Sequence, residues 1–288
     1  MDDETVGIAL VLTSAVGFGT LGIFGVIAAE EGLSIPSVLA LRFSLATVVV
    51  WAVRWYRDRF RVPSGRVLAI AVALGAIGYA TQSGLYFFGL EFMTAGMVAI
   101  VLYTYPAFVV CLVAIANPDR VTRILLVALG LSISGVALIT GVDPAGADPR
   151  GVVVVLGAAF AYSLYIVVSQ RALATVDAET LTAFVLPAAA ASFVAFGLGT
   201  NTLAMPDGAI GWGVVFAIAI LATVVPVLTF FAGIARIGAS RASIISTAEP
   251  AVTVALGALV LGEPVTVVTI GGGALVVAGV ILIQREDA

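Results

Sequence analysis

Long apolar stretches alternate with short polar breaks along the whole chain. Breaks rich in charge, proline and glycine divide it into ten apolar segments, and most of these approach or exceed the roughly 20 residues that cross the hydrocarbon core of a bilayer. We expect helices at 6–29, 36–55, 67–89, 94–116, 121–141, 151–170, 180–199, 211–235, 239–261 and 264–284. The pattern predicts an all-α integral membrane protein with ten transmembrane helices.

The arginines predict how these helices are oriented. If the N-terminus is cytoplasmic, eleven arginines fall inside, only Arg150 falls outside, and Arg42 lies within a helix. The eleven are Arg54, Arg57, Arg59, Arg61, Arg66, Arg120, Arg123, Arg171, Arg236, Arg241 and Arg285. Cytoplasmic loops of membrane proteins carry an excess of basic residues. We therefore expect a multi-pass protein of the cell membrane with both termini in the cytoplasm.

The composition agrees with a membrane location and excludes several kinds of chemistry. Hydrophobic residues make up 61% of the chain and charged residues 10%, whereas soluble domains carry about 25% charged residues. The chain has no histidine, no lysine and one cysteine, Cys111. We therefore expect no metal site, no cofactor, no phosphate-binding loop and no enzymatic activity. The acidic balance also argues against nucleic acid as a partner.

The two halves of the sequence resemble each other. When residues 233–266 are placed over 89–122, a shift of 144, ten of 34 positions are identical, and Pro250 falls on Pro106. This shift predicts two five-helix repeats, 1–144 and 145–288. An odd number of helices per repeat inserts the second copy upside down, and such inverted repeats are typical of secondary transporters.

Several motifs carry a resemblance to a known family. Glu249-Pro250 in the ninth segment, Leu-Gly-Glu at its end, the glycine-rich last segment and Arg42 in "LALRFSLA" resemble the EamA-type permeases of the drug/metabolite transporter superfamily. The resemblance covers essentially the whole chain, although "NPDR" replaces a second Leu-Gly-Glu in the first half. It implies export of small metabolites, amino acids or drugs, commonly driven by a proton or substrate gradient. It also implies a central cavity lined by the third, fourth, eighth and ninth helices.

Glu249 is the first candidate for a transport residue, because a charged group near the middle of a span is costly and usually functional. It could exchange a proton during transport or pair with a cationic group of the substrate. Alternatively, it could be protonated and only hold two helices together. The first repeat has Tyr105 at the equivalent position.

Two prolines should break their helices at symmetric positions. Pro250 has no N–H, which leaves the carbonyl of Ser246 unpaired, and Pro106 should act in the same way on the fourth helix. Broken helices at corresponding positions of two repeats point to a transporter's binding site. Polar residues, Tyr103 and Tyr105 among them, coincide with these breaks.

Further candidates lie on the third and eighth helices. Tyr79, Gln82 and Tyr86 share one helix face, and we take Thr223, Pro226 and Thr229 as their counterparts in the second repeat. For each of these side chains, a bond between helices is an alternative to substrate contact.

Charged residues nearer the helix ends have simpler interpretations. Arg42 could either extend to the outer membrane interface or bind an anion. Asp119 and Glu263 at helix ends should cap the helices that follow them.

The sequence therefore predicts a permease that moves a small organic molecule, an amino acid or a drug, outward by alternating access. The alternative is a passive facilitator or channel, in which flux persists without a proton gradient and is unchanged by Glu249→Gln. An intramembrane enzyme would need a nucleophile–base pair or metal ligands, and a receptor or scaffold would leave the repeat unexplained. The expected partners are a small-molecule substrate, the lipid bilayer and protons as a candidate coupling ion, in a monomer or homodimer.

Overall fold

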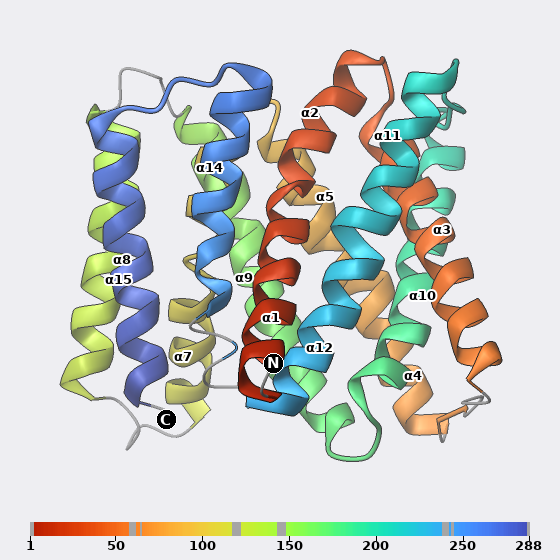
Figure 1. Cartoon of the computed structure of the whole chain (residues 1–288), viewed down its shortest axis with the longest axis horizontal. Coiled ribbons are helices and arrows are strands. Elements are labelled where there is room, and N and C mark those ends of the chain that lie inside the picture. The colour runs from red at the N-terminus through yellow and green to blue at the C-terminus, as the bar shows by residue number, and fades with distance from the viewer. Residues whose placement is uncertain are drawn as a thin grey trace.

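The computed structural model is a bundle of helices (Figure 1) and describes residues 3–57, 62–63, 65–116, 122–142, 148–237, 242 and 245–286. The helices of the first half are α1 (Asp3–Gly19), α2 (Leu21–Glu30), α3 (Ile35–Tyr56), α4 (Gly65–Ala73), α5 (Ala80–Gly89), α6 (Ala95–Leu102), α7 (Tyr105–Ala116) and α8 (Arg123–Val142). Those of the second half are α9 (Pro149–Leu173), α10 (Ala178–Gly199), α11 (Ala209–Ala219), α12 (Val225–Ile237), α14 (Ala248–Leu261) and α15 (Val267–Glu286). The prediction of an all-α chain is confirmed for the part of the chain described here.

Among the described residues, six helical stretches are long and apolar enough to cross a membrane. They are Asp3–Glu30, Ile35–Tyr56, Gly65–Gly89, Pro149–Ser169, Ala178–Gly199 and Ala209–Ile237. Shorter apolar helices cover the fourth, fifth, ninth and tenth expected segments. The chain is thus a multi-pass membrane protein, while the count of ten crossings stays a prediction.

Several expected helices are interrupted where the sequence pattern predicts continuity. The first segment breaks at Thr20, whose hydroxyl donates to the carbonyl of Gly17 at 2.6 Å. The third and eighth segments each contain a π-helical turn, η1 (Leu74–Tyr79) and η3 (Ile220–Val224), which begin 146 residues apart. π-turns of this kind occur often at functional sites.

Close helix contacts recur with a two-fold relation between the halves. Gly89 on α5 lies so close to Val155 on α9 that any side chain there would overlap it. Gly233 on α12 contacts Val11 on α1 in the same way. Gly233 is the counterpart of Gly89, 144 residues later, and Val11 is the counterpart of Val155, 144 residues earlier. Glycine at such contacts lets membrane helices approach closely.

The same relation holds for α8 and α15, which run side by side in opposite directions (Figure 1). Gly135 lies against Gly272 and Val276, while Gly279 lies against Ala128 and Ser132. Each of these positions maps onto its counterpart under the 144-residue shift. Reciprocal contacts of this kind support the two-repeat interpretation.

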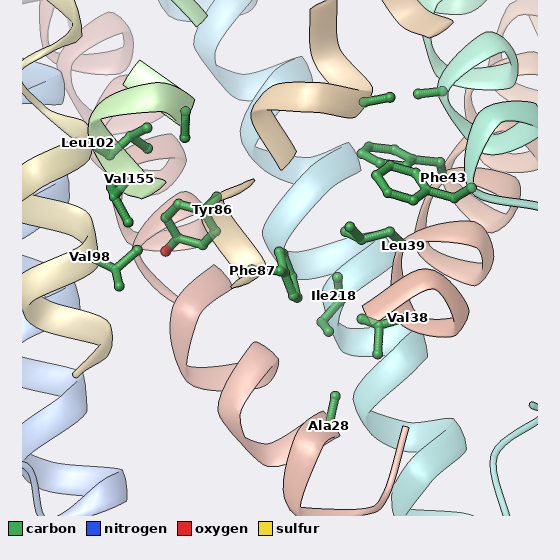
Figure 2. Close-up of a cluster of buried hydrophobic side chains, with 14 of the residues drawn as sticks. Ala28, Val38, Leu39, Phe43, Tyr86, Phe87, Val98, Leu102, Val155 and Ile218 are labelled. Carbon is green, nitrogen blue, oxygen red and sulfur yellow. The ribbon is translucent and has the colours of Figure 1, made fainter. Parts of the chain in front are cut away.

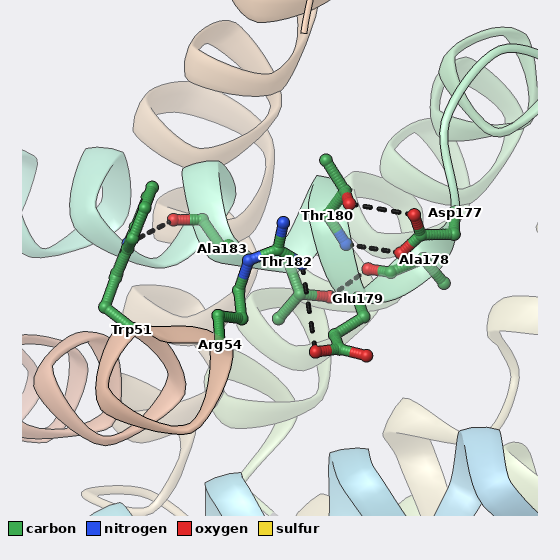
Figure 3. Close-up of polar contacts among 8 residues, drawn as sticks. All are labelled: Trp51, Arg54, Asp177, Ala178, Glu179, Thr180, Thr182 and Ala183. Atoms are coloured by element: carbon green, nitrogen blue, oxygen red, sulfur yellow. Dashed lines mark hydrogen bonds and ion pairs between the residues drawn. The ribbon is translucent and has the colours of Figure 1, made fainter. Parts of the chain in front are cut away.

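The helices α3 and α10 form an antiparallel pair that polar contacts join at both ends. At one end, Ser34 and Ser37 both donate to the carbonyl of Thr202, at 2.6 and 3.1 Å. At the other end, Arg54 Nη1 lies 3.8 Å from Glu179 Oε1 (Figure 3). The arginine pattern places Arg54 in a cytoplasmic loop, but it is 2% exposed in the last turn of α3, because Glu179 balances its charge there.

Glu263 differs from its sequence-based interpretation. Its carboxylate accepts from the amides of Ala95 at 2.7 Å and Gly96 at 3.3 Å, at the start of α6. It therefore caps a helix of the first half and not α15, the helix that follows it, because packing brings the start of α6 within its reach. Asp119 lies outside the described residues.

The main hydrophobic core joins both halves at the centre of the bundle (Figure 2). Phe43 from α3, Tyr86 and Phe87 from α5 and Val155 from α9 belong to it. α1 begins and α15 ends at the same end of the bundle (Figure 1).

Candidate functional site

A cavity of about 240 Å³ lies among the interrupted helices. It is close to the lower end of the sizes usual for small-molecule sites, about 300 Å³, which favours a small solute. Among the described residues, its lining contains one acidic side chain, Glu249, and one basic side chain, Arg42. The predicted site residues that line it are Arg42, Tyr79, Gln82, Tyr86, Tyr103, Tyr105 and Glu249. The structure therefore brings together candidates from α3, η1, α5, the α6–α7 region and α14.

Tyr103 connects the two broken helices across the repeat boundary. It lies in the turn between α6 and α7, and its hydroxyl is 2.7 Å from the carbonyl oxygen of Ser246 and 3.0 Å from Oε2 of Glu249. The Ser246 carbonyl is the one that Pro250 leaves without a helical partner. A side chain of the first half thus fills a hydrogen-bonding gap in the second half and contacts its carboxylate.

The prolines lie next to the interruptions. Pro106 is the second residue of α7, directly after the turn at 103–104, and Pro250 is the third residue of α14, after a turn at Thr247. Pro226 is the second residue of α12, directly after the π-turn η3. Pro226 packs against Gly17 on α1 and is not part of the cavity lining among the described residues.

Thr229 also lies apart from the cavity. Its hydroxyl donates to the carbonyls of Val225 at 2.9 Å and Pro226 at 3.2 Å, within its own helix. Its neighbours Val227, Phe230 and Phe231 line the cavity instead. The 144-residue shift places Tyr86 on Phe230 and not on Thr229, so the predicted residue lies one position away from the cavity-lining one.

Arg42 is buried and does not extend to the membrane interface. It is 2% exposed, and its Nε donates to Thr223 Oγ1 at 2.8 Å. The Thr223 hydroxyl in turn donates to the carbonyl of Ile218 at 2.9 Å, five residues earlier. The π-turn η3 thus positions the Thr223 hydroxyl that accepts from Arg42. Because Arg42 is buried in this contact, its side chain does not extend to the outer membrane interface.

Tyrosines form a continuous row of rings along the cavity. Ring centroids are 5.3 Å apart for Phe43 and Tyr79, 5.5 Å for Tyr79 and Tyr165, and 6.0 Å for Tyr165 and Tyr162. The row continues from Tyr162 to Tyr105 at 4.7 Å and from Tyr105 to Tyr103 at 5.8 Å. It thus leads from the ring beside Arg42 to the tyrosine that contacts Glu249.

Some lining residues were missed by sequence reasoning. The first helix contributes Ser14, Ala15, Phe18 and Leu21, on both sides of its break at Thr20. Gly17, Gly19 and Gly22 surround this break in the sequence. Thr182, Val185 and Leu186 of α10 also line the cavity.

Pro187 inside α10 is a further residue that sequence reasoning missed. Its missing N–H leaves the carbonyl of Ala183 free, and the indole N–H of Trp51 donates to that oxygen at 2.9 Å (Figure 3). The arrangement repeats that of Pro250, Ser246 and Tyr103. A proline in the middle of an apolar span was the available signal.

Asp177 is the residue directly before α10, and its side chain caps the start of that helix. Its carboxylate accepts from the amide of Thr180 at 2.7 Å and from the Thr180 hydroxyl at 2.8 Å (Figure 3). Partial burial acts to raise the pKa of Asp177, but these hydrogen bonds and the nearby Arg54 outweigh it and hold the pKa below its ordinary value.

A helical membrane bundle with a small, charged central cavity between broken helices is the arrangement of a membrane transport protein. The EamA-like transporter family matches the chain twice, at residues 5–141 and 149–285. The chain belongs to this family. A transporter role and the EamA resemblance are thereby confirmed, and the family is one of transporters, not enzymes.

Individual relatives agree with this membership. The uncharacterized transporter YcbK of Bacillus subtilis is 28% identical over 96% of this chain and 93% of its own length. The threonine/homoserine exporter RhtA of Escherichia coli K12 is 28% identical over 80% of this chain and 75% of its own length. A solved crystal structure at 20% identity covers 99% of this chain and 100% of its own with a TM-score of 0.67, which supports the fold.

Proposed function

We propose that this protein is a secondary transporter that exports a small organic molecule by alternating access. In this proposal, ten transmembrane helices form two inverted five-helix repeats, 1–144 and 145–288, with both termini in the cytoplasm. The shared end of α1 and α15 and the reciprocal glycine contacts support this arrangement.

The observation that carries the proposal is the position of Glu249. It lines the cavity at the start of α14, directly after a helix break, and contacts a tyrosine of the other half. Because this contact joins the two halves, a movement of one half against the other would change the hydrogen bonding of the Glu249 carboxylate.

Tyr103 supplies a physical basis for coupling to protons. Its hydroxyl has one hydrogen, while two oxygens, those of Ser246 and Glu249, lie within bonding distance. When Glu249 carries a proton, it can donate to Tyr103 while Tyr103 donates to Ser246, and both contacts are hydrogen bonds. When Glu249 is charged, the two oxygens compete for one hydrogen, which weakens the link between the halves.

The relatives support the direction and the size of the cargo. RhtA is named an exporter of threonine and homoserine, and a cavity of about 240 Å³ also favours solutes of this scale. We therefore extend outward transport of a small polar metabolite, such as an amino acid, to this chain.

The test begins with a metabolite survey of cells that express the chain against cells that lack it. The accumulated or depleted solute is then followed in proteoliposomes with and without a pH gradient. We expect gradient-driven flux that Glu249→Gln reduces by at least about tenfold, and that the exposed-site control Glu91→Gln leaves unchanged. Flux that ignores both the gradient and Glu249→Gln would instead establish the passive facilitator.

A further inference from the structure

Arg42 is a buried cation without a carboxylate partner in the described part of the chain. The ion pairs found there join Arg54 to Glu179 and Arg236 to Asp3. The Nε of Arg42 donates to the Thr223 hydroxyl, but its Nη1 is buried with no hydrogen-bond partner among the described residues. A buried guanidinium nitrogen without an acceptor is costly, so the site is electrostatically incomplete.

Aromatic rings hold the guanidinium in place without completing its hydrogen bonding. Its central carbon lies 4.8 Å from the ring centroid of Phe43 and 6.0 Å from that of Phe87, and both rings belong to the central core (Figure 2). Ring faces attract a cation, but they do not replace an oxygen acceptor for Nη1. Phe43, Thr223 and Tyr79, which also bonds to the Arg42 side chain, therefore fix its orientation, while Nη1 is left without an acceptor among the described residues.

The lining residues that the structure describes offer no carboxylate to this nitrogen. Glu249 is the one acidic residue of the lining, and it contacts Tyr103 instead of Arg42. The row of tyrosine rings runs between the two charges. Arg42 thus lines a space that a solute with its own acceptor oxygens can enter.

We propose that Arg42 is an anion-binding subsite of the central cavity and takes the carboxylate of a small organic substrate. A planar guanidinium matches a carboxylate with two parallel N–H···O bonds. A phosphate monoester fits less well, because it carries up to two charges and the lining holds a single basic residue. The inference rests on the proposed function only in taking this cavity as the substrate cavity.

The test measures binding, not transport, by titration calorimetry on the full chain in lipid nanodiscs. The probes are the twenty L-amino acids and the straight-chain carboxylic acids of about two to six carbons, a size range suited to a cavity smaller than most drug sites. The strongest binder is then compared with its primary carboxamide, which has the same shape and no charge. We expect the carboxylate to bind at least about tenfold more tightly than the carboxamide.

Two variants connect this difference to the arginine. Arg42→Gln should bring carboxylate and carboxamide to within about twofold of each other, and Arg42→Lys should keep part of the preference. The control is Arg123→Gln, at the exposed start of α8, which should behave as the parent protein. Because the comparison of carboxylate with carboxamide uses the unmodified chain, it holds even where Arg42→Gln does not fold.

Three results would overturn the proposal: no probe binds, the carboxamide binds as well as the carboxylate, or the preference survives Arg42→Gln. Arg42-dependent carboxylate binding in a protein that shows no flux in proteoliposomes would count against the proposed function alone. Flux without any preference for the carboxylate would count against the subsite alone.

Discussion

At the scale of single residues, the backbone carbonyls released by prolines are paired with side chains from the other half of the chain. Tyr103 donates a hydrogen bond to the Ser246 carbonyl that Pro250 leaves without a helical partner. Trp51 donates one to the Ala183 carbonyl that Pro187 leaves without a partner. In a membrane no water replaces such a partner in the hydrocarbon region, so each contact is both a stabilising bond and a constraint on movement.

Trp51→Phe should destabilise the protein by about 1–3 kcal/mol, because it keeps an aromatic ring and leaves the Ala183 carbonyl unpaired. Thermal unfolding in detergent, followed by fluorescence, measures the effect. The control is Trp55→Phe, since Trp55 is 81% exposed, and it should unfold at the parent temperature. Equal stability of the two variants would show that the indole bond contributes nothing.

Tyr103→Phe should reduce gradient-driven transport at least about tenfold while leaving the protein folded, because it removes the hydroxyl that Glu249 and Ser246 share. The effect should not add to that of Glu249→Gln, since one change removes the titrating carboxyl group and the other removes the hydroxyl through which that group acts. Flux in proteoliposomes of the two single variants and the double variant measures the coupling. Fully additive losses would separate the two residues.

Asp177→Ala should lower stability at pH 7 by about 0.5–2 kcal/mol, because it removes the cap of α10. The pKa of Asp177 is lowered in the folded protein, so its contribution is present above its ordinary value near 3.8 and is lost as the pH falls through the folded value. The difference in unfolding temperature from the parent should therefore shrink as the pH falls below 3.8. The control is Asp207→Ala at an exposed loop position, and a loss independent of pH would contradict the charge-based cap.

At the scale of elements, the sequence was sufficient to locate the helical segments and the prolines that accompany their breaks. Apolar runs report burial in lipid or protein, and a missing N–H is a local property, so both can be read without a structure. The break at Thr20 and the π-turns are different, because they depend on what packs against them. The sequence also left open whether Arg42 extends to the membrane interface, since only the packed structure shows that Thr223 lies within hydrogen-bonding distance of it.

The reciprocal glycine contacts provide a test at this scale. Gly89→Ala should destabilise the protein by about 1–3 kcal/mol, because its new methyl group would overlap Val155 between α5 and α9. Gly213→Ala is the matched control, since nothing lies within 4 Å of that position on α11, and it should be neutral or slightly stabilising. Thermal unfolding of both variants under the same conditions makes the comparison. Equal effects would indicate that α5 and α9 can separate freely.

At the scale of the whole molecule, the two halves exchange contacts and share one cavity. Glu263 of the second half holds the start of α6, and Tyr103 of the first half holds the break before α14. Neither half therefore contains a complete site, which agrees with a mechanism in which the halves move against each other.

The proposed topology predicts which surfaces a membrane-impermeant reagent can reach. With Cys111 replaced, a single cysteine at Met205 should react from outside intact cells, and one at Ala174 should react only after the membrane is opened. Both positions lie between helices and are exposed, which makes them a matched pair. Labelling of both positions from the same side would contradict the crossing of the membrane by α10, and the reverse pattern of labelling would contradict the orientation.

The pair α3 and α10 has a mechanical consequence. Ser34 and Ser37, at the start of α3, donate hydrogen bonds to Thr202, just after α10. Arg54, near the end of α3, contacts Glu179 at the start of α10. The two helices are therefore linked at both ends. If the protein works by alternating access as proposed, we expect α3 and α10 to keep their positions relative to each other through the transport cycle. A covalent bridge between Ser37 and Leu203 would then leave turnover intact, whereas a bridge between Gly96 and Val254, which pack together across α6 and α14, would stop it.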